Sequence, residues 1–174
     1  MSIRQFLSHL TLCLLAFSLP LTGLAAGQKA ESPKQTFLLK GVDVYGKPVN
    51  LDDYKGKAVL VSFFTVDCVK CENDLRLMRE FYGENKGKNF VNIAINLDSD
   101  KQTLAEYMEL IKIAIPAKQH FPIAWRKAKG HTDNFGELTS NPTHFVLGTD
   151  HKLLWRRNGI FKPDDWDQLW STLP

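Results

Sequence analysis

The chain has 174 residues, which is sufficient for one domain with a substantial hydrophobic core. Hydrophobic residues make up 44% of the chain and charged residues 24%, as is ordinary for a soluble globular protein. The formal net charge is only +3 and no stretch is a dense block of Lys and Arg, so we predict no nucleic-acid-binding surface.

The first 26 residues differ from the rest of the chain. Arg4 is their only charged residue, and an apolar stretch covers residues 10–19 before the small residues Ala25 and Ala26. This order of regions is typical of a secretory signal peptide. We therefore predict a signal peptide over residues 1–26, cleaved after Ala25 or Ala26, and an exported protein. An uncleaved membrane anchor is the alternative, although the apolar stretch is short for crossing a bilayer.

The mature chain begins with a polar segment and then a predicted hairpin. Residues 27–35 lack a core pattern, so we predict a flexible leader ahead of one folded domain over residues 36–174. Short apolar or alternating segments at 36–45 and 49–51 are separated by the turn residues 46–48. This pattern predicts a β-hairpin.

A predicted strand and a predicted helix meet at the stretch Cys68-Val69-Lys70-Cys71. Residues 58–64 are apolar enough for a central buried strand, and a helical pattern runs from Cys68 to about Tyr82. The free N–H groups and the positive dipole end of a helix N-terminus favour a thiolate. The junction is therefore suited to thiol–disulfide chemistry.

The cysteine count supports this interpretation. Of the three cysteines, Cys13 lies in the predicted signal peptide, which leaves Cys68 and Cys71 as the pair in the mature chain. A bond that closes so short a loop removes little entropy from the unfolded chain, so it is a poor structural staple. We therefore predict a redox-active dithiol, with a structural disulfide as the alternative.

The rest of the chain predicts further strands and helices. Apolar patterns predict a strand at 90–96, a helix between the N-cap candidates at 98–100 and Pro116, a short strand or packed loop at 121–125, a hairpin at 143–147 and 152–157, and a helix from Pro163. Trp166, Leu169 and Trp170 form the apolar face of that last helix. Residues 127–139 have weak periodicity, so we predict a loop with a short helix near 134–138. The strand–helix–strand start and the later hairpin together predict an α/β fold with a mixed sheet.

This order of elements, with C-x-x-C at a helix start and Asn141-Pro142-Thr143 before a strand, resembles the thioredoxin fold. The opening stretch from Phe37 to Val61 is similar to the TlpA/ResA-like branch, the exported thioredoxins of bacteria. The resemblance covers roughly residue 36 to the C-terminus. It implies a three-layer α/β fold, in which helices flank a central mixed β-sheet and an N-terminal β-hairpin is added. It also implies a location in the bacterial periplasm.

The resemblance assigns roles around the dithiol. Cys68 matches the attacking cysteine and Cys71 the resolving one. Asp74 matches an acid found three residues after the second cysteine in ResA-like members, and it is our candidate base for Cys71. The alternative for Asp74 is a solvated carboxylate in the first helical turn that stabilises the helix dipole.

The resemblance also assigns a substrate-facing wall. Pro142 matches the family's cis-proline beside the disulfide, with Asn141 before it and Thr143 after it. A cis-proline there would present the backbone of Asn141 to a bound peptide, which pairs with it like an added strand. The alternative is a trans proline in a plain turn.

The sequence departs from the family pattern next to the cysteines. Asp67 stands where a Trp precedes the first cysteine, and Val69-Lys70 replaces a dipeptide that often contains proline. Lys70 would favour a thiolate at Cys68, whereas Asp67 would oppose it if it faced the sulfur. The direction of electron flow is therefore left open by these residues.

Other chemistry has weaker support in the sequence. The mature chain has four histidines, namely His120, His131, His144 and His151. Because there is no H-x-x-H pattern or further cysteine pair, we predict no metal site and assign each histidine to the surface or to packing. His144 lies closest in sequence to Pro142, and two cysteines with a histidine also suit Cu(I). Thr65-x-x-Cys68 is similar to a peroxiredoxin nucleophile motif, but Val61 replaces the expected proline, so we rank a peroxidase third.

We predict an exported thiol–disulfide oxidoreductase that needs no cofactor. Cys68 would attack a client disulfide and Cys71 would resolve the mixed disulfide. The resemblance implies that the protein reduces its clients, and that its partners are client proteins and a membrane electron donor of the DsbD kind. A copper-handling protein that uses the dithiol as ligands is the alternative, followed by a degenerate member that serves only as an interaction surface.

Overall fold

The computed structural model describes residues 35–173. The predicted signal peptide at 1–26, including Cys13, and most of the predicted leader at 27–35 lie outside the described residues. Within residues 35–173, no helix has both the length and the apolar character needed to cross a membrane.

The centre of the fold is a mixed sheet of five strands in the order β5-β4-β3-β7-β8. Its strands are β3 (Ala58–Phe64), β4 (Phe90–Asn96), β5 (Ile123–Trp125), β7 (Thr143–Leu147) and β8 (Leu153–Asn158). β4 is parallel to β3 and β5, whereas β7 is antiparallel to β3 and β8. The predicted α/β fold with a mixed sheet is therefore confirmed.

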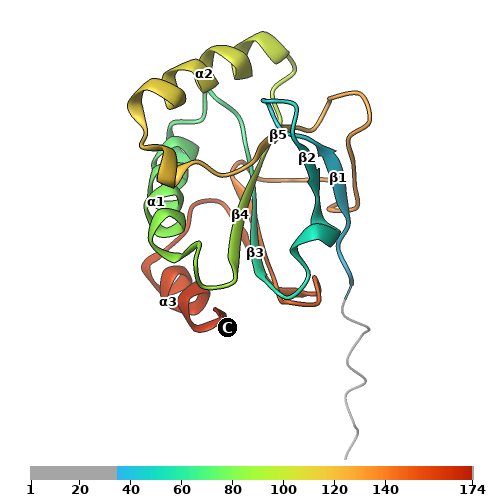
Figure 1. The fold of residues 1–174 in the computed structure, drawn as a ribbon, viewed down its shortest axis with the longest axis vertical. Helices are drawn as coiled ribbons and strands as arrows, with labels where there is room; N and C mark the ends of the chain where they lie inside the picture. The colour runs from blue at the N-terminus through green and yellow to red at the C-terminus, as the bar shows by residue number, and fades with distance from the viewer. Residues whose placement is uncertain (1–34, 174) are drawn as a thin grey trace, which may run out of the picture. The chain divides into compact units, whose positions relative to one another are not determined.

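Helices and a second, small sheet cover this central sheet. The helices in the described part of the chain are η1 (Leu51–Tyr54), α1 (Val69–Asn85), α2 (Lys101–Ala114), η2 (Ala117–Gln119) and α3 (Pro163–Ser171), of which η1 and η2 are 3₁₀-helices. Figure 1 shows α1 and α3 on one side of the central sheet and the N-terminal hairpin on the other. This arrangement matches the predicted three layers.

The predicted N-terminal hairpin belongs to a sheet of three strands. Its order is β2-β1-β6, with β1 (Leu39–Val42), β2 (Pro48–Asn50) and β6 (Thr132–Asp133). The hairpin is confirmed, but the third strand and the path of residues 134–138 differ from the prediction. Those five residues form no helix, because Asn134 and Asp133 bind the neighbouring backbone through their side chains.

β3 separates two apolar clusters because its side chains alternate between the two faces of the sheet. The helix-side cluster includes Leu60, Phe64, Leu75, Met78 and Leu104, and the hairpin-side cluster includes Phe37, Val61, Phe63, Phe135 and Phe145. Both faces of the strand are buried. A continuous apolar run such as 58–64 is the pattern expected for a strand covered on both sides.

The first helix extends beyond the predicted end near Tyr82, as far as Asn85. A glycine at position 83 predicts a helix end, but here it is needed for packing, since a Cβ on Gly83 would lie 2.9 Å from Gln119 Cγ. The glycine therefore lets η2 approach α1 closely. The Asn85 side chain donates a hydrogen bond to the Phe81 carbonyl and supports the additional turn.

The last helix buries only part of its predicted apolar face. Leu169 is fully buried and Trp166 packs against the helix-side cluster, as predicted. Trp170 is instead 52% exposed. Lys88 Nζ lies 3.9 Å from the centre of its ring, so a cation–π contact at the surface takes the place of core packing.

A buried ionic cluster attaches β6 to the fold. Arg126 donates two hydrogen bonds to the Asp133 carboxylate at 2.8 and 2.7 Å, and His131 Nε2 lies 3.0 Å from it. Burial by itself would raise the pKa of Asp133, but the hydrogen bonds from His131 and Arg126 outweigh it and hold that pKa well below its ordinary value. The cluster therefore depends on an ionised aspartate.

We expect Asp133→Asn to lower the free energy of unfolding by about 2–3 kcal/mol near neutral pH, because one partner of a buried ion pair is lost. A carboxyl group with a depressed folded pKa contributes stability above its unfolded pKa, and this contribution is lost as the pH falls through the folded value. The difference between variant and wild type should therefore shrink below about pH 4. Urea denaturation at several pH values measures both effects. The exposed Asp53→Asn serves as the control, and an equal loss there would contradict the prediction.

Candidate active site

The two cysteines of the C-x-x-C motif lie where β3 ends and α1 begins. They are joined by a disulfide with an S–S distance of 2.05 Å. Cys68 is half-buried and Cys71 is fully buried, because α1 turns its second cysteine toward the sheet. The pair therefore offers one sulfur to a reactant from solution and keeps the other inside.

Cys68 is the N-cap of α1, and its sulfur accepts the hydrogen bond that caps the helix. The backbone N–H of Cys71 donates to Cys68 Sγ over 3.1 Å. This N–H also donates to the Cys68 carbonyl over 2.8 Å, and together with the positive end of the helix dipole it stabilises negative charge on the sulfur. The predicted link between a helix start and a thiolate therefore has a specific donor. Asp67 and Lys70 are both exposed, so solvent weakens their opposing influences on the sulfur.

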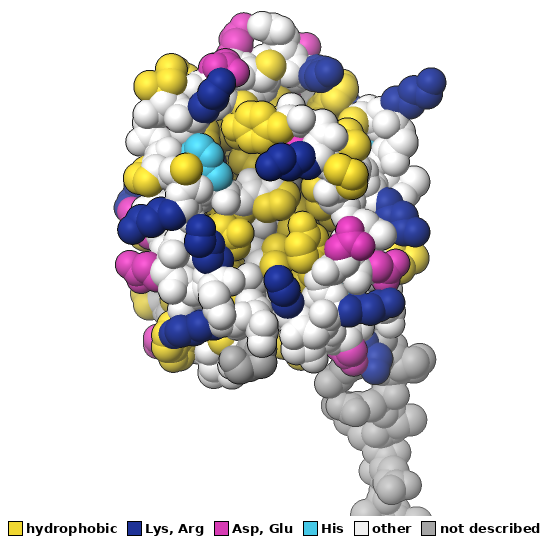
Figure 2. Space-filling model, viewed as in Figure 1, with side chains coloured by type: hydrophobic (Ala, Val, Ile, Leu, Met, Phe, Trp, Pro, Cys, Tyr) yellow, Lys and Arg dark blue, Asp and Glu magenta, His cyan; other side chains and the backbone are white. Residues whose placement is uncertain are grey.

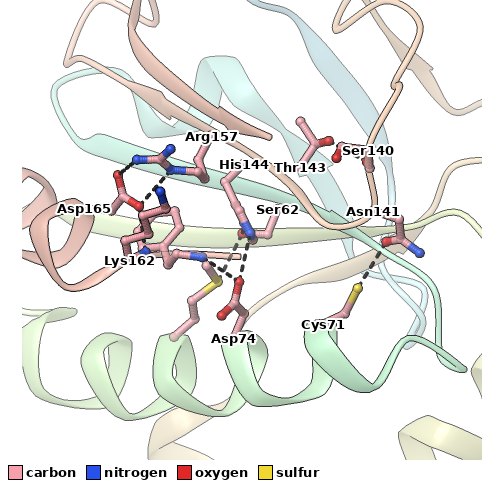
Figure 3. A network of polar contacts seen from close by, with 12 residues as sticks. Ser62, Cys71, Asp74, Ser140, Asn141, Thr143, His144, Arg157, Lys162 and Asp165 are labelled. Carbon is pink, nitrogen blue, oxygen red and sulfur yellow. Dashed lines mark hydrogen bonds and ion pairs between the residues drawn. The ribbon is translucent and has the colours of Figure 1, made fainter. Parts of the chain in front are cut away.

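The loop before β7 forms a wall beside the disulfide. Asn141 Oδ1 lies 3.1 Å from Cys71 Sγ (Figure 3). The Asn141 carbonyl oxygen lies 4.0 Å from Cys68 Sγ. The Asn141 amide donates to Thr65 Oγ1 over 2.7 Å, so one side chain connects both sides of the site. The Asn141–Pro142 peptide is cis, as predicted.

The three residues of this wall differ in exposure. Asn141 is exposed, Pro142 is buried, and Thr143 is fully buried with its hydroxyl donating to the Ser140 carbonyl over 2.6 Å. The Thr143 side chain thus orders the loop instead of facing a client. Thr65, the residue of the peroxiredoxin-like motif, accepts its hydrogen bond from Asn141.

Asp74 lies one helical turn after Cys71 on the face of α1 that packs against the sheet. Its residue exposure is 2%, and Oδ2 accepts a hydrogen bond of 2.9 Å from the backbone N–H of Phe161. The interpretation of Asp74 as a solvated first-turn carboxylate is therefore wrong. Residues three positions apart on a helix are neighbours, so Asp74 is placed beside Cys71.

A buried histidine contacts Asp74 from the sheet. His144 Nε2 lies 3.2 Å from Asp74 Oδ2, at an angle outside that of a good hydrogen bond, and Nδ1 lies 3.0 Å from Ser62 Oγ (Figure 3). Burial lowers the pKa of His144, and Asp74 offsets this effect only in part. The sequence predicts a surface or packing role for His144, but this residue belongs to a polar group beneath the dithiol. The sequence signal for this group was one polar residue inside each of two apolar runs, Ser62 in 58–64 and His144 in 143–147.

A second pair of polar residues missed by the sequence analysis holds the loop before Cys68. Asp98 Oδ2 accepts hydrogen bonds from the backbone N–H of Val66 and from the Asn96 amide, at 2.9 and 2.6 Å. Asn96 is the last residue of β4, the strand next to β3, and Asp98 follows two positions later. An asparagine and an aspartate at the end of an apolar strand were the available signal. Their contacts fix the approach of the chain to the helix.

Two pockets of the surface differ in their position relative to the cysteine pair. Figure 2 shows apolar side chains gathered at the centre of one face, with lysine and arginine around them. One cavity of about 560 Å³, between β1 and α2, is lined by residues such as Tyr45, Leu104 and Trp125 and by neither cysteine. A pocket of about 340 Å³ adjoins Val69, the residue after Cys68.

Within residues 35–173, no three His, Cys, Asp or Glu side chains come together as a metal site.

Comparison with known proteins agrees with this geometry. Residues 26–156 match the model of the AhpC/TSA family. The thiol–disulfide oxidoreductase ResA of Bacillus thuringiensis subsp. konkukian is 26% identical over 132 residues, which are 76% of this chain and 72% of that protein. ResA of Bacillus subtilis is 23% identical over 112 residues, 64% of this chain and 59% of that protein.

Solved structures share the fold. The crystal structure of a putative thiol:disulfide interchange protein DsbE from Chlorobium tepidum has a TM-score of 0.58 and 23% identity, covering 80% of this chain and 91% of that chain. A thioredoxin family protein from Chlorobium tepidum TLS has a TM-score of 0.62 and 20% identity, covering 82% and 97%. The chain therefore belongs to the AhpC/TSA family, and within it to the TlpA/ResA-like thiol–disulfide oxidoreductases.

Proposed function

We propose that the protein is exported and reduces disulfides of client proteins, with Cys68 as the nucleophile and Cys71 as the resolving thiol. The observation that carries this assignment is the hydrogen bond from the Cys71 N–H to Cys68 Sγ at the start of α1. It supports a thiolate on the sulfur that solvent reaches, while Cys71 is buried. The assignment of the two roles follows from this difference.

The reaction consists of two exchanges. The Cys68 thiolate attacks one sulfur of a client disulfide, the client S–S bond breaks, and the released client sulfur leaves with the electron pair and takes up a proton. Cys71 then loses its proton and attacks Cys68 Sγ, which breaks the mixed disulfide and releases the second client thiolate. The client has gained two electrons, and the protein is left as the Cys68–Cys71 disulfide.

Asp74 is our proposed base for the second exchange. Asn141 Oδ1, 3.1 Å from Cys71 Sγ, would accept a hydrogen bond from the Cys71 thiol and so favour its neutral form. Removing that proton then requires a nearby acceptor. Asp74 is buried one turn along the same helix face, where bulk solvent does not compete for the proton.

Client contact is proposed at the loop of Asn141 and at the apolar surface beside Val69. The Asn141 backbone near Cys68 can pair with an extended client segment as an added strand. The pocket beside Val69 is lined by Tyr107, Ile111 and Ile115, which suit apolar client side chains, and also by four polar or charged residues of α1. Val69 itself is 81% exposed. Such a surface recognises exposed backbone and apolar residues rather than one sequence.

The proposed cycle also requires an electron source outside the cytoplasm. Each turnover leaves the dithiol oxidised, and an oxidising compartment does not reduce it again. We therefore propose a membrane electron donor of the DsbD kind as the second partner and the bacterial periplasm as the location. The same exposed Cys68 would receive the electrons, because Cys71 is buried.

The reduction potential tests the proposed direction. We expect the Cys68–Cys71 couple to equilibrate with thiol–disulfide buffers near −270 mV or lower, about the value typical of thioredoxin. Trapping the mixture with an alkylating reagent and separating the reduced and oxidised protein measures it. A potential near about −120 mV would contradict the reductant assignment and mark an oxidant instead.

A further inference from the structure

We propose that His144 is a positioning residue of this site, which holds together with Asp74 the proton that Cys71 releases when it attacks the mixed disulfide. The inference rests on the proposed function and adds a residue to it. His144 comes from β7 and Asp74 from α1, and they are 70 positions apart in the chain. Both side chains are almost fully buried, with exposures of 1% and 3%.

The contacts of Ser62 favour one tautomer of His144. Ser62 has one hydroxyl proton, and its Oγ donates to Met78 Sδ over 3.2 Å. With the hydroxyl proton on the Met78 side, the 3.0 Å contact between Ser62 Oγ and His144 Nδ1 has Nδ1 as its donor. In a neutral imidazole only one nitrogen carries hydrogen, so Nε2 is left as an acceptor.

His144 Nε2 therefore faces Asp74 with a lone pair. Asp74 Oδ2 lies 3.2 Å away, and Nε2 has no other polar partner in the described part of the chain. A carboxylate oxygen and a bare ring nitrogen repel each other in a buried site, whereas a proton on either group relieves the repulsion. The pair is thus arranged to take up one proton in the oxidised form of the protein.

The other charged groups near His144 balance one another. Arg157 lies opposite His144 in the register of β7 and β8, and its guanidinium is bonded to Asp165 at the start of α3. Asp165 favours a protonated His144 and Arg157 opposes it. Because Arg157 and Asp165 bind each other, Asp74 is the acid that remains to exchange a proton with Cys71.

The proton of the Cys71 thiol moves to the Asp74–His144 pair during the second exchange and returns when the protein is reduced again. Cys71 gives its proton to the Asp74–His144 pair and becomes the thiolate that attacks Cys68 Sγ. The client thiolate leaves with the electron pair of the broken bond. When the donor later reduces the disulfide, Cys71 recovers the proton from the pair. The buried pair therefore carries one negative charge in the reduced protein and none in the oxidised protein, and a buried Cys71 thiolate exists only during the attack.

A two-phase reaction with Ellman's reagent tests the inference. Attack by Cys68 on excess reagent releases the first thionitrobenzoate, and attack by Cys71 on the resulting mixed disulfide releases the second at a rate independent of reagent concentration. At pH 7 we expect His144→Gln to slow the second phase at least about tenfold. The glutamine amide would donate a hydrogen bond to the Asp74 carboxylate, which would then be stabilised without taking up the proton of Cys71. The first phase should stay within about twofold, and the gap should narrow with rising pH.

Two further variants keep the result decisive. Ser62→Ala retains the imidazole but frees Nδ1, so the hydrogen can move to Nε2 and satisfy Asp74; we expect the second phase to slow about fivefold. This variant decides the matter if His144→Gln does not fold. His151→Asn removes another buried histidine, in the β7–β8 turn, and should leave both phases unchanged.

The possible outcomes distinguish the role of His144 from the proposed function on which that role rests. A second phase with the wild-type rate and pH profile in both His144→Gln and Ser62→Ala overturns the role of His144, even if their melting temperatures fall. A wild-type protein that reacts with the reagent but shows no concentration-independent second phase overturns the proposed function as well.

Discussion

Insulin disulfides should no longer be reduced when Cys68 is replaced by serine. Cys68→Ser is expected to lower the rate to the background of dithiothreitol alone, because a serine hydroxyl stays protonated where a thiol forms a thiolate. Cys71 cannot substitute for it, since it is buried behind Asn141. The appearance of insulin turbidity with dithiothreitol as the electron source measures the effect.

Cys71→Ser is the matched control for this experiment. It keeps the attacking sulfur and its position at the start of α1, so it should react once and remain bound to the client as a mixed disulfide, visible by mass spectrometry. Full reduction of insulin by Cys68→Ser would contradict the assignment of the nucleophile. Peroxide consumption by a wild type that leaves insulin intact would instead favour a peroxidase.

The second large effect is expected for Asp74→Asn. The asparagine carbonyl still accepts the hydrogen bond from Phe161 N–H, so the local structure should survive. An amide cannot take a proton from Cys71, however, and we expect the resolving step to slow about 10²-fold near neutral pH. The second phase of the reaction with Ellman's reagent reads this step directly, and accumulation of the mixed disulfide gives an independent measure.

Glu72→Gln provides the comparison for Asp74→Asn. Glu72 is an exposed acid in the first turn of the same helix, so its loss tests whether any nearby carboxylate suffices. We expect the rate of resolution to change by less than about twofold. If Asp74→Asn resolves at the wild-type rate while its unfolding free energy falls, Asp74 serves only to hold the backbone at Phe161.

Much of the fold was predictable because its central strands are buried on both faces. The bounds of β3, β4 and β7 agree with the apolar runs 58–64, 90–96 and 143–147. The start of α2 was also visible, since Asp100 caps it by accepting from the N–H groups of Gln102 and Thr103. In these segments a local pattern and the tertiary environment require the same residues.

The misjudged parts depend on contacts between distant segments. Gly83 predicts the end of α1, but its lack of a side chain instead leaves room for Gln119 of η2. Strand β6 pairs with β1 across more than 90 residues, and such pairing leaves little local pattern in two residues. The contact of His144 with Asp74 depends in the same way on the register of β7 against β3, which places His144 opposite Ser62.

The division of the core by β3 has a consequence for how this protein can change. Cys71, Asp74, Ser62 and His144 all lie on the helix side of the sheet, whereas the ring cluster of Phe37, Phe63, Phe135 and Phe145 lies on the other. One strand thickness thus separates the redox chemistry from much of the hydrophobic stabilisation. Repacking the aromatic side would alter resistance to unfolding and leave proton and electron transfer intact. The stability of the fold and the redox properties of the dithiol can therefore vary independently.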